Sequence, residues 1–475
     1  MVFSSLSFLF LFLPIFLICY YLIKDEYKNG LLFLGSLLFY GLGEPSFLLL
    51  MLTTIVLNFF FGLIIEKCQE KTFWKGTVFI TALLIDFGTL FFFKYTNFFL
   101  ENINALLRMQ HSSYTLTLLE LTLPLGISFY TFQIVSYIID VYKGSIAAEH
   151  SLIDLGAYIA MFPQLIAGPI VMYSDIHDAL KKRTVGIENL DEGLKTFILG
   201  LGYKVILANR IGLLWNEVCT IGYVSISTPL AWLGALSYAL QLYFDFCGYS
   251  LMAIGLGKML GFTMPENFRN PYMARSVTEF WRKWHMTLGT WFRTYVYIPL
   301  GGNRKGKARM FFNLFVVWFL VGLWHGASWN FILWGLFIFI MQMIEKGFLL
   351  KWLEKDALPA KLLSHLYMIF YILVSWILFA VSDFSELGIY LSRMFGLTDS
   401  ASINSLDFLP LLSDYGPLLA LGIFCSTDFP KRIYQKLSEK IPTFGISLSI
   451  YLGIFWYAVY FLAIGISNPF LYFRF

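Results

Sequence analysis

Long apolar segments recur along almost the whole chain, and they constrain its fold more than any other feature. The sequence is 58% hydrophobic and only 13% charged, whereas soluble domains carry about 25% charged residues. A helix that crosses a membrane needs about 20 apolar residues. The apolar segments lie near residues 3–23, 30–44, 46–65, 76–93, 118–141, 152–172, 194–217, 228–257, 310–324, 326–345, 365–382, 415–427 and 445–466. We therefore predict an all-α integral membrane protein with about 11–13 membrane segments, some of them re-entrant.

Composition also argues against several functional classes. The net charge is only +4 and no basic domain stands apart from the membrane segments, so we expect no nucleic-acid partner. The five cysteines are scattered without a CxxC pair, which favours neither a zinc site nor a disulfide framework. No metal-spaced His/Asp cluster, Walker loop or serine nucleophile elbow is present, so we expect no metal and no ATP-driven mechanism. The first 23 residues lack a basic n-region, and we interpret them as a retained helix.

The distribution of Lys and Arg predicts the membrane topology, because positive charge collects on the cytoplasmic side. Residues 258–309 contain ten Lys and Arg against two Glu, and we expect this segment to be cytoplasmic or interfacial and to carry short amphipathic helices. Residues 152–172 disturb the alternation and contain Pro163 and Pro169, which predicts a re-entrant or broken segment. No repeat or linker divides the chain, so we predict one transmembrane domain over 1–475 in a cell membrane.

Within the basic segment, aromatic residues recur at helical spacing across 275–298. Phe280, Trp281, Trp284 and Trp291 alternate there with basic residues, which predicts an amphipathic helix at the membrane interface. His285 belongs to this run. It is either a group that positions a donor or assists catalysis, or an interfacial anchor, and its position alone favours neither.

His325 lies inside an apolar stretch, between Gly322 and Gly326. An ionisable residue in hydrocarbon is a functional hypothesis by default. Burial disfavours the charged imidazolium, and a neutral ring can accept a proton from an attacking hydroxyl. The glycines would leave room for backbone or substrate. The alternative is a structural histidine bonded between helices.

The basic segment would also attract a phosphorylated cytosolic donor such as a coenzyme A thioester, because Arg and Lys form charge-assisted hydrogen bonds. Ordinary positive-inside charge explains any single residue equally well. The residues that we expect to bind the donor are Arg282, Lys283, Trp284, Arg293, Asn303 and Arg304.

Other polar residues in apolar segments are interpreted as structural pairs, because a buried charge needs a partner. Asp245 would pair with Arg210 or Lys204. The remaining polar positions of this kind are Asp86, Gln133, Ser136 and Gln241.

Several longer motifs resemble those of membrane-bound O-acyltransferases. Shorter matches occur at 94–98 (KYTNF), 123–133, 162–170, 243–250, 268–272 and 468–475. The most specific are 278–303 (TEFWRKWHMTLGTWFRTYVYIPLGGN) and 322–327 (GLWHGA). The stretch 298–303 is similar to the alginate-type branch of the family more than to the D-alanyl-teichoate branch.

The resemblance implies a multi-helix bundle around a central tunnel, with His325 as the catalytic histidine and His285 as the second characteristic one. It also implies that acetyl from cytosolic acetyl-coenzyme A passes to an extracytoplasmic SGNH-hydrolase-type partner, which acetylates a polysaccharide, in a bacterial plasma membrane. D-alanyl transfer to teichoic acid or acylation of peptidoglycan stays open. So do two other classes, a polysaccharide or lipid transporter with His325 in a proton relay, and a scaffold that only anchors a secreted acetyltransferase.

Overall fold

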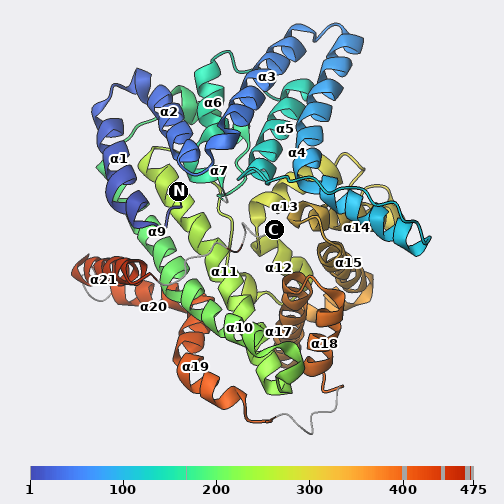
Figure 1. Cartoon of the computed structure of the whole chain (residues 1–475). Coiled ribbons are helices and arrows are strands. Elements are labelled where there is room, and N and C mark those ends of the chain that lie inside the picture. The colour runs from blue at the N-terminus through green and yellow to red at the C-terminus, as the bar shows by residue number, and fades with distance from the viewer. Residues whose placement is uncertain (1, 167, 398–403, 440–443, 466–470, 472–475) are drawn as a thin grey trace. The chain divides into compact units, whose positions relative to one another are not determined.

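The computed structural model describes residues 2–166, 168–397, 404–439, 444–465 and 471, and all regular elements in these residues are helical (Figure 1). The predicted all-α class is confirmed. Nine helices among the described residues are long and apolar enough to cross a membrane, and Phe8–Leu22 is a shorter apolar helix. The number is below the predicted 11–13 because several apolar segments form only short or interrupted helices.

The chain groups into two compact units. The N-terminal unit comprises 1–197 with 253–265, and the C-terminal unit comprises 198–252 with 266–475. The helices up to the boundary within α9 are α1 (Leu13–Leu22), α2 (Lys28–Gly41), α3 (Leu48–Lys67), α4 (Thr72–Met109), α5 (Ile127–Lys143), α6 (Leu152–Ala160), α7 (Phe162–Leu165), α8 (Tyr173–Lys181) and α9 (Ile187–Gly202). Those that follow are α10 (Asn209–Ile221), α11 (Thr228–Met259), α12 (Val277–Lys283), α13 (Met286–Phe292), α14 (Gly306–His325), α15 (Trp329–Ile344), α16 (Leu350–Leu353), α17 (Leu358–Ala380), α18 (Phe384–Met394), α19 (Phe408–Cys425), α20 (Phe429–Ser438) and α21 (Phe444–Ala463).

Segment 152–172 is broken, as its prolines predict. Helix α6 ends at Ala160, and α7 begins with Phe162 followed by Pro163. Phe162 is fully buried among aromatic rings of α1, α2 and the turn before α1, with ring centroids 5.2 Å from Phe16 and 5.5 Å from Phe39. The break therefore places a large ring in the core of the N-terminal unit, which compensates for the interrupted helix.

Segment 118–141 is helical only from Ile127, where α5 begins. The preceding residues run alongside α4, and two asparagines of α4 bind their backbone. Asn97 both donates to and accepts from Leu119, at 2.8 and 2.9 Å, and Asn104 does the same with Leu116 at 2.8 and 2.7 Å. These amides satisfy backbone groups that a helix would satisfy internally. Helices α3, α4 and α5 pack side by side in this unit (Figure 1).

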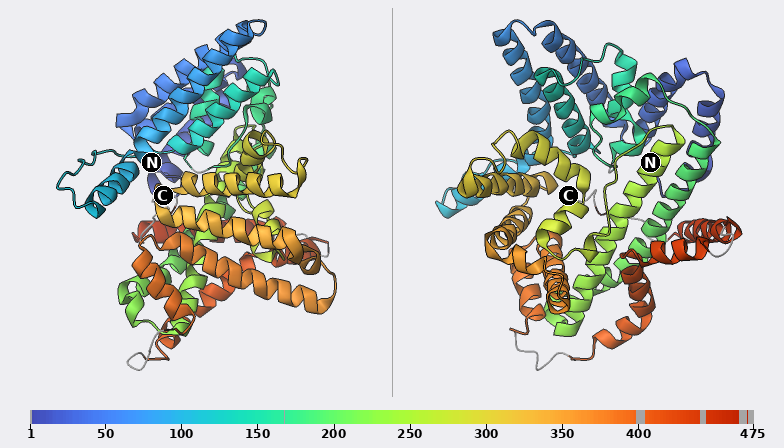
Figure 2. Two further views of the ribbon diagram at one scale, coloured as in Figure 1. Left: turned by 90° about the vertical axis from the view of Figure 1, so that its right-hand side faces the viewer. Right: turned by 180° about the vertical axis from the view of Figure 1, so that it is seen from behind.

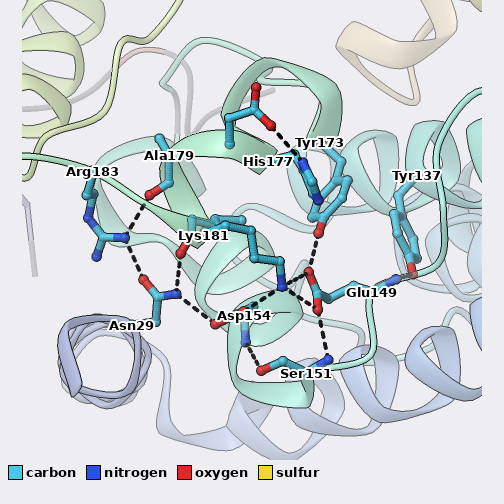
Figure 3. A network of polar contacts seen from close by, with 12 residues as sticks. Asn29, Tyr137, Glu149, Ser151, Asp154, Tyr173, His177, Ala179, Lys181 and Arg183 are labelled. Atoms are coloured by element: carbon cyan, nitrogen blue, oxygen red, sulfur yellow. Dashed lines mark hydrogen bonds and ion pairs between the residues drawn. The ribbon is translucent and has the colours of Figure 1, made fainter. Parts of the chain in front are cut away.

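A polar network links α2, α6 and α8 within the N-terminal unit (Figure 3). Lys181 Nζ contacts Glu149 at 2.7 Å and Asp154 at 2.8 Å. Asn29 donates to Asp154 at 2.7 Å, and Arg183 donates to Asn29 at 2.7 Å. Each of these charged groups is therefore bound to another part of the same unit.

In the C-terminal unit, α15 packs against both α14 and α17 (Figure 2). Gly322 of α14 allows this close approach, because a Cβ there would lie 2.5 Å from the carbonyl oxygen of Phe331. Small residues commonly bring membrane helices together in this way. The expectation that Gly322 and Gly326 leave room for backbone or substrate is confirmed for backbone at Gly322. At Gly326 the space is taken by a side chain, since a Cβ there would overlap the Phe331 ring.

The predicted pairing of Asp245 is confirmed, with Lys204 as its partner. The two charged atoms are 2.5 Å apart, and both side chains are almost fully buried. Lys204 also donates to Asn209 at 2.9 Å, and the backbone N–H of Leu471 donates to Asp245 at 2.9 Å. Arg210 instead lies over the ring of Phe461. Apart from Leu471, the motif 468–475 lies outside the described residues.

Candidate active site

His325 is the last residue of α14 and lies in an aromatic environment. Its ring centroid is 4.9 Å from Trp334 and 5.2 Å from Phe379, both nearly perpendicular to it. The side chain is buried, and Trp334 is itself fixed by a hydrogen bond to Ser375 at 3.0 Å. Helices α15 and α17 therefore hold the imidazole in one orientation.

His285 lies where the predicted helix over 275–298 is interrupted. Instead of one helix, α12 ends at Lys283 and α13 begins at Met286. His285 has φ +46° and ψ +53°, in the left-handed region, which few non-glycine residues adopt. Such a conformation costs roughly 1–2 kcal/mol and persists only where surrounding contacts require it.

Asn267 supplies those contacts from the extended segment before α12. Its Oδ1 lies 3.1 Å from His285 Nδ1, 3.3 Å from the backbone N of Thr287 and 2.9 Å from the Thr287 hydroxyl. Its backbone carbonyl accepts from the N–H of Met286 at 2.9 Å. Asn267 therefore satisfies the first backbone donors of α13, which have no partner within the helix.

The start of α12 is fixed by a buried carboxylate that follows α15. Glu345 accepts from the backbone N–H of Val277 at 2.6 Å, and from the N–H and hydroxyl of Thr278 at 2.9 and 2.8 Å. The Trp281 ring then packs against Trp318 of α14 at 4.8 Å. The apolar side of this region therefore packs against protein within the C-terminal unit.

A cavity of about 940 Å³ brings the two histidines into one site. Its volume is at the upper end of the range of small-molecule sites, about 300–1,000 Å³. The wall contains both His285 and His325, and of the residues expected to bind a donor it contains Arg282, Trp284, Arg293, Asn303 and Arg304. Lys283 is not part of the wall, and its ammonium lies 2.6 Å from Glu279.

The arginines of the wall carry charge that other residues do not neutralise. Within the described part of the chain, Arg282, Arg293 and Arg304 form no ion pair with a carboxylate, and all three are exposed. Their guanidinium groups can therefore form hydrogen bonds with an anionic ligand.

The wall also contains polar residues that the sequence did not single out as site residues, among them Gln342 and Lys346. Gln342 is buried and accepts a hydrogen bond from Trp318 Nε1 at 3.1 Å. The two residues are four positions apart and therefore share one helical face. Polar residues at that spacing near the end of an apolar segment are the signal that the sequence offers for them.

Burial lowers the pKa of His285 to about 3, because desolvation disfavours the charged ring. At neutral pH the imidazole is therefore uncharged, with one ring nitrogen that donates and one that accepts. A neutral ring beside a cavity can exchange hydrogen bonds with a substrate without contributing charge.

Comparison with known proteins identifies the family. Residues 144–382 match the membrane-bound O-acyltransferase (MBOAT) family, and this range includes both histidines and the cavity. The chain belongs to this family. It is a multi-pass membrane protein and an O-acyltransferase.

The relatives include proteins that act on two different glycans. The chain is 42% identical to the probable alginate O-acetylase AlgI of Pseudomonas aeruginosa over 385 residues, 81% of this chain and 72% of the relative. It is 37% identical to the probable alginate O-acetylase AlgI of Pseudomonas putida over 468 residues, 96% and 93% of the two chains. It is also 33% identical to the peptidoglycan O-acetyltransferase of Helicobacter pylori over 432 residues, 84% and 80%.

Proposed function

We propose that this protein takes an acetyl group from cytosolic acetyl-coenzyme A and passes it across the membrane to an extracytoplasmic polysaccharide, through a partner of the SGNH-hydrolase type. The observation that carries the proposal is the shared cavity. It combines a buried histidine in a membrane segment, a second histidine that burial keeps neutral, and three arginines that form no ion pair with any described carboxylate. A proton acceptor beside an anion-binding wall suits a phosphorylated thioester donor.

Acetyl is the acyl group best supported by the relatives. Those that cover more than four fifths of this chain include two probable alginate O-acetylases and a peptidoglycan O-acetyltransferase. An alginate-like exopolysaccharide or a cell-wall glycan is therefore the proposed class of final acceptor. The hydroxyl that first receives the acetyl group belongs either to the glycan or to a side chain of the partner.

In the proposed reaction, His325 acts as the general base. Its ring takes the proton of the acceptor hydroxyl while the oxygen forms a bond to the thioester carbonyl carbon. The carbon–sulfur bond then breaks, and the sulfur of the donor leaves as a thiol after it receives the proton from the ring. Arg282, Arg293 and Arg304 would hold the phosphates of the donor, which keeps the thioester near the histidines.

Replacing His325 with Ala tests this proposal. General base catalysis contributes roughly 10²–10⁴-fold, so we expect O-acetylation to fall at least 100-fold while the amount of protein in the membrane stays unchanged. The readouts are ester-linked acetate on isolated glycan and transfer of label from radiolabelled acetyl-coenzyme A with the partner present.

His365→Ala is the matched control, because His365 lies half-buried on α17 and is not part of the cavity wall. We expect its activity to equal that of the wild type. Near wild-type acetylation by H325A would disprove the general-base role. A wild-type protein that transfers no label with its partner present would favour transport instead.

A further inference from the structure

We propose that Asn267 is a positioning residue that fixes His285, a residue of the cavity wall, as its Nδ1–H tautomer, so that the buried Nε2 can act only as a hydrogen-bond acceptor. The assignment of the tautomer follows from geometry. Its meaning for catalysis rests on the function proposed above.

One atom of the Asn267 amide group contacts His285 Nδ1, the Thr287 backbone N and the Thr287 hydroxyl. That atom is 3.3 Å from the backbone N of Thr287. A backbone N–H can only donate, so the atom that receives this bond is the amide oxygen and not the NH2 group. The Thr287 hydroxyl, 2.9 Å from the same atom, is then also a donor.

The contact with this oxygen determines where the proton of the His285 ring lies. An amide oxygen has no proton to give, so the 3.1 Å contact with His285 Nδ1 requires a proton on that nitrogen. Because burial keeps the ring neutral, the single ring proton is on Nδ1 and Nε2 carries a lone pair. In this state Nε2 cannot donate to a developing oxyanion. It can accept from a hydroxyl or amide N–H of a substrate.

The contacts around the His285 ring maintain this tautomer. The ring packs against Phe246 of α11 at 4.7 Å and Trp324 of α14 at 5.8 Å, and neither residue titrates. The left-handed backbone at His285 and the Asn267 bonds to α13 define one geometry for the ring. The tautomer of a catalytic histidine is set by the partner of its other nitrogen, and here that partner is a neutral amide.

The tautomer can be read without turnover. The chain has six histidines, so nitrogen NMR of ¹⁵N-histidine-labelled protein in bilayers resolves few signals, and His285 is assigned by its loss in H285N. In the wild type we expect a protonated Nδ1 and an unprotonated Nε2 at neutral pH. A protonated Nε2 in the wild type would overturn the proposal, whatever the activity of any variant.

Two substitutions at Asn267 connect the tautomer to the rate. N267L removes the acceptor oxygen, so we expect a mixture of tautomers and a loss of activity of about 10- to 100-fold, which is less than removal of a general base. N267D keeps an acceptor oxygen, so we expect it to retain the Nδ1–H signal and to recover most of the lost activity. An unchanged tautomer in N267L together with lost activity would show a purely structural role and would overturn the proposal.

Thr287→Val is the matched control. It removes the hydroxyl that binds Asn267 but leaves the contact between Asn267 and His285, and Thr287 is not part of the cavity wall. We expect the tautomer of the wild type and a rate within about twofold of it. If N267L does not accumulate, the wild-type and N267D signals still decide the tautomer. Failure of the H325A prediction with an Nδ1–H signal present would refute the proposed function alone.

Discussion

Basic residues of the Lys181 network in the N-terminal unit are bound to other side chains, whereas the arginines of the cavity wall in the C-terminal unit have no carboxylate partner among the described residues. Lys181 contacts two carboxylates, and the nearby Arg183 binds Asn29 (Figure 3). Arg282 lies on the cavity wall and forms no ion pair with the described residues. A paired charge fixes the fold, whereas a charge held at a cavity without a counter-ion remains available to a ligand. We therefore expect pairing, more than residue type, to tell the cations that stabilise the fold from those that bind a ligand.

The strongest test of this comparison uses two neighbouring residues, Arg282 and Lys283. We expect R282M to lower kcat/KM for the acyl donor about tenfold, mainly through a higher KM, because a charge-assisted hydrogen bond contributes about 1.5–3 kcal/mol and exposure weakens it. We expect K283M to stay within about twofold, because Lys283 is paired with Glu279. Steady-state kinetics with acetyl-coenzyme A gives both values. Equal losses in both variants would mean that the general basic character of the segment matters, and not the cavity.

The second prediction concerns stability. We expect K181M to lower the free energy of unfolding by about 1–3 kcal/mol, because it leaves the buried carboxylate of Glu149 without its cation, and to leave kcat/KM of the folded protein unchanged. Thermal unfolding in detergent measures the loss of stability, and steady-state kinetics normalised to the amount of folded protein measure kcat/KM.

The matched control is K195M. The side chains of Lys181 and Lys195 are equally exposed, at 43%, but the partner of Lys195, Asp191, is 58% exposed whereas Glu149 is 3% exposed. An exposed pair contributes roughly 0–1 kcal/mol, so K195M should have a much smaller effect. Equal effects would show that the burial of the partner does not matter.

The sequence predicted those features that depend on local chemistry or on the need to pair a buried charge. The prolines at 163 and 169 predicted the broken segment, and Asp245 was expected to pair with Lys204 or Arg210. Which of the two basic residues faces Asp245 depends on the register of their helix. That register is shifted by a π-helical turn at Tyr203–Ala208, which the apolar pattern does not reveal.

The break at His285 could not be predicted from the sequence. Aromatic spacing continues through it, and the left-handed backbone depends on Asn267, a residue 18 positions away. The inclusion of Gln342 and Lys346 in the cavity depends in the same way on how α15 packs against α14. Both features depend on tertiary packing. The polar spacing of Gln342 and Lys346 makes them candidates, but it does not show which cavity they line.

The smallest expected effect is a difference in how Glu149 of the N-terminal unit and His285 of the C-terminal unit contribute to stability as the pH falls. Burial alone would raise the pKa of Glu149, but hydrogen bonds from Lys181 and Tyr173 hold it below its ordinary value of 4.5. A lowered carboxyl pKa stabilises the fold above pH 4.5, and this contribution is lost as pH falls further. The pKa of His285 is lowered from 6.5 to about 3, so its contribution decreases from pH 6.5 downward, because the unfolded state binds the proton first.

Melting temperatures measured from pH 7.5 to 3.5 should therefore show two windows. The difference in melting temperature between the wild type and E149Q should stay constant down to about pH 4.5 and become smaller below it. The difference for H285N should begin to become smaller already below about pH 6.5, and asparagine is a suitable replacement because it tolerates the left-handed backbone. If both differences change over the same window, the two regions are coupled through unfolding, and the distinction between paired and available charges does not extend to stability.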